Sequence, residues 1–99
     1  MSGIDVPKMN EMAQLKAQIN QLLQREIQKQ SWGQGLEQTQ AIWVRNYEEH
    51  IIDSREENKD KLIIDLQRTI ISDVAHGSGM PAQIFQSVLV ALEDLRNPQ

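Results

Sequence analysis

The chain has no cysteine and only four aromatic residues among its 99 residues. The absence of cysteine excludes disulfide frameworks, thiolate metal sites and cysteine nucleophiles, and it is typical of proteins from a reducing compartment. No stretch reaches the ~20 apolar residues that a membrane span needs, and residues 1–12 lack the basic and apolar regions of an export signal. We therefore expect a cytoplasmic protein that makes no use of a membrane.

Basic charge is also scarce, since 10 lysines and arginines stand against 14 aspartates and glutamates, for a net charge of −4. Residues 1–50 hold five basic and six acidic side chains, and residues 51–99 hold five and eight. Neither half has the positive surface that drives nonspecific binding to nucleic acid or to an anionic membrane. A chain of 99 residues forms one domain at most, and a domain of this size is only marginally stable alone.

Apolar residues recur at helical intervals, and no run alternates apolar with polar residues as a half-buried strand would. The pattern predicts an all-α, four-helix bundle-like single domain over residues 1–99, with helices at about 8–30, 35–54, 58–76 and 81–95. The polar stretch "DSREENKD" separates the second helix from the third in this prediction, and one long helix is the alternative. A cap at this break is expected either from Ser54 with Glu57, in a capping box, or from Asn58.

The first helix has an apolar seam with spacings of three, four and three residues, made of Met12, Leu15, Ile19 and Leu22. A two-heptad helix cannot cover this seam alone, so we expect it to be buried in an interface within the chain or with a second copy. The small size of the chain, this seam and a broad apolar face on the fourth helix favour a twofold homodimer. The glutamines between the seam residues form either a neutral solvated face or a polar surface for a partner.

The segment "QSWGQG" ends the first helical pattern, because its two glycines allow the chain to reverse. Trp32 lies in this turn. A tryptophan here either folds back over the end of the bundle or stays exposed as an anchor for a binding partner. Trp32 is therefore a candidate interface residue together with the seam.

The stretch "DVAHGSGMPAQIF", residues 73–85, places a histidine, glycines and a serine side by side. His76 and Ser78 do not form a nucleophile elbow, and no lysine follows the glycines as in a phosphate loop. His50 with Glu49 and Asp53 is a weak metal-binding pattern. We predict no catalytic, cofactor-binding or metal site and no small-molecule substrate; a glycine ends the third helix and Pro81 begins the fourth.

The same region resembles a helix-turn-helix motif over Ile70 to Leu92, with a small residue, a turn glycine and apolar residues in the expected places (Ala75, Gly79, Met80, Phe85 and Val88). The resemblance implies that the fourth helix contacts DNA through Gln83, Gln86 and Ser87, since glutamine can pair with adenine. However, no lysine or arginine lies between Thr69 and Leu95 to contact phosphates.

The sequence therefore favours a small, non-enzymatic regulatory or adaptor protein that acts through protein–protein interaction and self-association. Its expected interface residues are Met12, Leu15, Ile19, Leu22 and Trp32, and its protein partner is not identified by the sequence. The alternative is a sequence-specific DNA-binding transcriptional regulator that uses a C-terminal helix-turn-helix.

Overall fold

The computed structural model describes residues 6–29, 32 and 35–98, with side chains from Glu11 onward. Helix α1 (Val6–Leu23) continues directly into the π-helical segment η1 (Gln24–Lys29). Three further helices follow, which are α2 (Glu37–Asp53), α3 (Lys59–Ala75) and α4 (Ala82–Arg96). Within these ranges the chain forms no strand, and the predicted all-α fold of four helices is confirmed.

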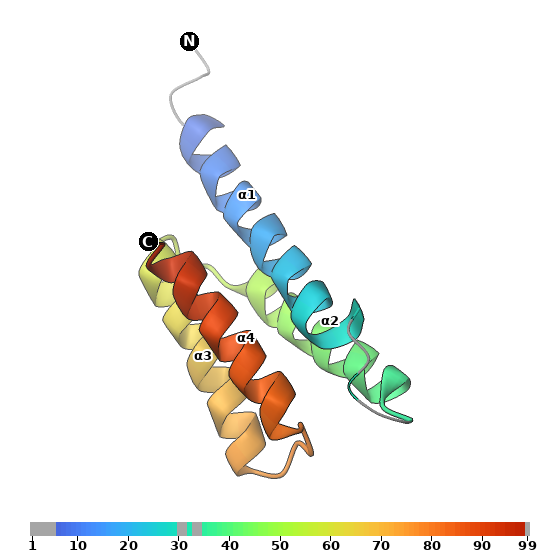
Figure 1. Ribbon diagram of the computed structural model, residues 1–99. Helices are drawn as coiled ribbons and strands as arrows, with labels where there is room; N and C mark the ends of the chain where they lie inside the picture. Colours follow the sequence, from blue (N-terminus) through green and yellow to red (C-terminus); the bar gives the residue numbers. More distant parts are fainter. Residues whose placement is uncertain (1–5, 30–31, 33–34, 99) are drawn as a thin grey trace.

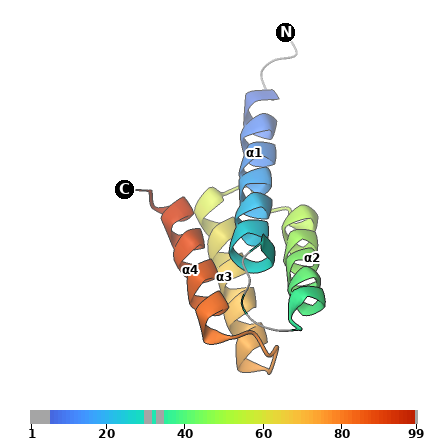
Figure 2. The same cartoon turned by 45° about the vertical axis from the view of Figure 1, so that its right-hand side comes forward.

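The four helices run alternately in opposite directions (Figure 1). Figure 2 shows α1 in front, with α2 on one side of it and the α3–α4 hairpin on the other. The first turns of α1 extend past the ends of the other helices in both views, and the molecule measures 54 × 27 × 20 Å. The fold is thus an elongated bundle in which α1 and η1 contact α2 on one side and α4 on the other.

The apolar seam of α1 is covered by the chain itself. Leu15, Ile19 and Leu22 are buried, and Met12 is half-buried against the same core. The neighbouring Leu23 and Ile27 are fully buried, so the buried face of this segment is wider than the four-residue seam. Of the two interfaces left open by the sequence, the structure places these residues in the one within the chain, so the seam gives no reason for a dimer.

The break between α2 and α3 falls at residues 54–58, so the two helices are separate. Asn58 caps α3, because its side-chain oxygen accepts a hydrogen bond from the backbone N–H of Lys61 at 3.1 Å. Ser54 instead accepts from the backbone N–H of Glu56 at 3.2 Å. Of the two caps considered from the sequence, Asn58 is the one that forms.

The glycine-containing loop after residue 75 is the connection between α3 and α4. The N–H of Gly77 donates to the carbonyl of Val74 at 3.1 Å, and that of Ser78 donates to the carbonyl of Asp73 at 2.9 Å. This pair of bonds is a Schellman motif, which needs the left-handed backbone that Gly77 adopts with φ of 90°. Helix α4 begins one residue after Pro81. The carbonyl of Pro81 accepts a hydrogen bond from the backbone N–H of Phe85 at 3.0 Å, which is the first bond of the helix.

Among the described helices, none combines the length and the apolar character of a membrane-crossing segment.

Candidate protein-binding groove between η1 and α4

An open groove of about 580 Å³ runs between η1 and α4. Its lining combines the end of the first helical element with the outward side of the last helix, and consists of Arg25, Glu26, Trp32, Gln83, Gln86, Ser87, Val90, Ala91 and Asp94. The groove is shallow and faces solvent, so a ligand would lie along it without being enclosed.

The shape of one wall depends on how η1 ends. The last carbonyls of a helix have no partner within the helix, and they must be satisfied by other groups. The indole N–H of Trp32 donates to the carbonyl of Glu26 at 3.1 Å, and the side-chain amide of Gln40 donates to the carbonyl of Ile27. Gln40 is only 2% exposed, so α2 supplies this bond from inside the core.

Glu26 joins the two walls of the groove. Its carboxylate accepts a hydrogen bond from the Ser87 hydroxyl on α4, and it forms an ion pair with Arg25, with Nε and Oε2 2.7 Å apart. The acidic charge of Glu26 is therefore neutralised by its neighbour while its position is fixed by α4. Asp94 lies at the far end of the groove and leaves it with a net negative charge.

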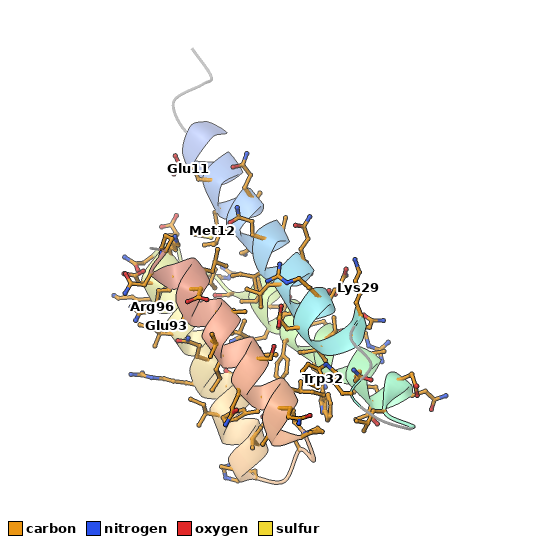
Figure 3. The ribbon with its side chains drawn as sticks, in the orientation of Figure 1. Glu11, Met12, Lys29, Trp32, Glu93 and Arg96 are labelled. Carbon is orange, nitrogen blue, oxygen red and sulfur yellow. The ribbon has the colours of Figure 1, made fainter. Side chains whose placement is uncertain are left out.

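The apolar part of the groove is formed by Trp32 and by Val90 with Ala91. Trp32 is half-buried and packs against the core, so one side of the ring is covered and the other contributes to the groove. Figure 3 shows it between the end of η1 and the start of α4. Val90 is 60% exposed, so most of its apolar side chain is available at the surface of the groove.

The structure brings together residues that the sequence assigned to two different hypotheses. Trp32, proposed as a protein anchor, lies in the same groove as Gln83, Gln86 and Ser87, proposed as DNA contacts. Gln83 and Gln86 are exposed, whereas Ser87 is half-buried and bonded to Glu26. The seam of α1 lies inside the core and has no part in this groove.

Glu26, Gln40 and Asp94 were missed from the sequence. Each is one polar residue among many at unremarkable spacing, and Gln40 belongs to a chain rich in glutamine. Their roles depend on the contact of η1 with α2 and α4, which local patterns do not reveal. The change from α to π geometry at Gln24 has no signal in the sequence that we recognise.

The arrangement of α3 and α4 differs from that of a helix-turn-helix. Such a motif joins its helices at about 90–120° so that the second can enter the major groove. Here α3 and α4 lie side by side and antiparallel in both views (Figures 1 and 2). The Gln67 amide on α3 donates a hydrogen bond to the Glu93 carboxylate on α4 at 3.2 Å, which joins the two helices at this point.

Of the other residues considered for chemistry, His50, His76 and Ser78 make polar contacts within the chain. His50 Nε2 lies 3.0 Å from Asp65 Oδ2 on α3, while the adjacent Glu49 is exposed. Nδ1 of His76 lies 2.7 Å from the Ser72 carbonyl, and the Ser78 hydroxyl accepts from the N–H of Met80 at 3.3 Å. No three histidine, aspartate or glutamate side chains in the described part of the chain are placed to hold one metal ion.

Comparison of the chain with protein-family models, with curated proteins and with solved structures finds no match.

Proposed function

We propose that this protein is a non-enzymatic binding module that receives an amphipathic helix of a partner protein in the groove between η1 and α4. The observation that carries the proposal is that a half-buried tryptophan, an exposed valine and two glutamines line one open groove. Grooves between two helices commonly bind the apolar face of a third helix.

The composition and openness of the groove suit the binding of a protein better than catalysis. Tryptophan is enriched among the residues that dominate interface energetics, and Val90 provides a second apolar contact beside it. The exposed amides of Gln83 and Gln86 both donate and accept hydrogen bonds, as the polar rim of an interface requires. An open channel does not exclude water, which an enclosed catalytic site would do.

The length and charge of the groove indicate the form of the partner. Gln83 and Asp94 are eleven positions apart on α4, which corresponds to about 16 Å or three helical turns. Because Arg25 neutralises Glu26, the uncompensated charge is that of Asp94. The partner segment we propose is a helix of about three turns with an apolar stripe and a lysine or arginine near Asp94.

A phage library of short amphipathic helices, selected against the folded protein, tests this proposal. Selected peptides should bind wild type and lose at least about tenfold in affinity for Val90→Glu. Ile71→Glu is the matched control, because Ile71 is also an exposed apolar residue of the α3–α4 hairpin, at 47% exposure, but lies outside the groove. Peptides that bind both variants equally well would overturn the assignment of the groove.

Trp32 gives a second measurement in the same experiment. The chain has two tryptophans, so Trp43→Phe leaves Trp32 as the only one. Binding of a tryptophan-free peptide should shift the emission of Trp32 to shorter wavelength, because the peptide covers the indole ring and removes it from water. Binding without any change in Trp32 emission would place the partner elsewhere.

A further inference from the structure

A second surface, separate from the groove, lies on the outer face of α2. Four residues at spacings of three, four and three form one stripe there, namely Ile42, Arg45, Glu49 and Ile52. Ile42 and Ile52 are 48% and 60% exposed, and the two charged residues between them are exposed as well. The opposite face of α2 packs in the core, so this stripe is the free side of the helix.

The two charges of the stripe are not used within the chain. Neither Arg45 nor Glu49 takes part in an ion pair or hydrogen bond with another described residue. The stripe therefore offers two apolar contacts and two unpaired opposite charges to a helix that packs along it.

The order of residues in the stripe is self-complementary. Read from either end it is an isoleucine, a charge, the opposite charge and an isoleucine, and the positions are symmetric about residue 47. In a twofold interface each residue meets the one related to it by this symmetry. An antiparallel pair of α2 helices therefore places Ile42 against Ile52 of the second copy, and Arg45 against its Glu49.

We propose that this protein forms a twofold dimer in which the α2 helices of two copies pack antiparallel along this stripe. The charges select the orientation, because a parallel pair would set Arg45 against Arg45 and Glu49 against Glu49. Two isoleucine layers enclose the two ion pairs and limit their contact with water. The contact is made by one 17-residue helix of each copy, so it is small and the dimer is weak.

Sedimentation equilibrium over a protein concentration of about 10 µM to 1 mM, the range suited to a weak contact, tests the association. The average mass should rise from 11.4 kDa toward twice that value as concentration increases. Arg45→Glu alone should weaken the dimer about tenfold or more, because it sets two carboxylates against each other in both ion-pair layers. Glu49→Arg alone should do the same through paired arginines.

The double variant Arg45→Glu with Glu49→Arg gives the decisive comparison. It reverses both charges together, which restores opposite charges across the axis, and should return the dissociation constant to near the wild-type value. Because both positions are exposed, all three variants should keep wild-type helicity by circular dichroism. Ile71→Gln, an exposed isoleucine on α3, is the control that should leave association unchanged.

The lack of native cysteine allows a direct test of orientation. A mixture of the single variants Ile42→Cys and Ile52→Cys should form a mixed disulfide dimer under mild oxidation. Either variant alone should cross-link poorly, because equivalent positions lie about 15 Å apart along antiparallel helices.

Three outcomes would overturn the proposal. They are a wild type that stays monomeric at the highest concentration, a double variant that fails to recover, and preferential cross-linking of each cysteine variant with itself. The stripe and the groove share no residue, so failure of one proposal is distinguishable from failure of the other.

Discussion

The hydroxyl of Tyr47 on α2 donates a hydrogen bond to Oδ2 of Asp73 on α3, over a distance of 3.0 Å. Tyr47 is 1% exposed and Asp73 is exposed, so this bond lies at the boundary between the core and the surface. Burial raises the pKa of Tyr47 well above its usual value of 10, and the hydrogen bond to Asp73 and the negative charge of that carboxylate raise this pKa further. The pair thus holds the only tyrosine of the chain in its neutral form.

This pKa predicts a loss of stability at alkaline pH. Unfolded tyrosine ionises near pH 10 while folded Tyr47 stays protonated, so stability is fully present below pH 10 and falls as the pH rises above it. Tyr47→Phe should lower the free energy of unfolding by about 1 kcal/mol at about pH 8, with a smaller difference at about pH 11. Urea unfolding at both pH values measures this, and parallel losses in the two proteins would contradict it.

The burial of Ile19 predicts that the α1 seam supports the monomer. Ile19 is fully buried, so Ile19→Ala should lower the free energy of unfolding by about 2–5 kcal/mol. Gln18→Ala, at the exposed neighbouring position, should change it by no more than about 0.5 kcal/mol. Urea unfolding at low protein concentration measures both. A folded, equally stable Ile19→Ala monomer would place the seam in a contact between copies.

The cap of α3 predicts unequal effects at two adjacent residues. Asn58→Ala should cost about 1 kcal/mol, because the N–H of Lys61 loses its acceptor. Glu57→Ala should cost no more than about 0.5 kcal/mol, since Glu57 is exposed and lies before the cap. Thermal unfolding of the two variants compares these values. A larger loss for Glu57→Ala would indicate a capping box that starts at Ser54.

The buried amide of Gln40 predicts coupling between α2 and the groove. Gln40→Ala leaves the Ile27 carbonyl without this donor and should cost about 1–3 kcal/mol. It should also shift the emission of Trp32 to longer wavelength, measured with Trp43→Phe, because Gln40 and Trp32 satisfy adjacent carbonyls of η1. Gln38→Ala, at an exposed position of the same helix, is the control. Unchanged emission in Gln40→Ala would show that Trp32 is held independently.

The charge of the C-terminal region predicts the outcome for DNA. No lysine or arginine lies between Thr69 and Leu95, so we expect no binding to a labelled mixed-sequence duplex at about 50 mM salt. Fluorescence anisotropy with increasing salt measures this. Binding that declines steeply with salt and is lost in Gln83→Ala with Gln86→Ala would favour the DNA-binding alternative.

The helices were predictable because their apolar residues face one core, and the spacing of such residues is a local property. The same holds for the loop after α3, where Gly77 supplies the left-handed backbone that the turn requires. Glycine and proline restrict the chain through their own geometry, whatever packs against them. These features therefore needed no knowledge of tertiary contacts.

The groove was only half predictable. Trp32 stands out in the sequence as a tryptophan in a glycine turn, and the outer face of α4 follows from its periodicity. Glu26 acts through a contact with a residue 61 positions away, and Gln40 through one 13 positions away. Helical periodicity does not predict contacts between elements. The destination of the α1 seam was open for the same reason, because an apolar stripe does not specify which surface covers it.

The π geometry of η1 also bears on which length changes the chain tolerates. A π turn holds about one residue more than an α turn, so η1 contains an extra residue per turn that no other described helix has. Deleting one residue between Gln24 and Lys29 would let the segment close as ordinary α-helix and keep Ile19 facing inward. A deletion in the middle of α3 or α4 would instead rotate one half of the helix by about 100° against the other. Among the described helices, η1 is therefore the one in which the deletion of a single residue is most readily absorbed.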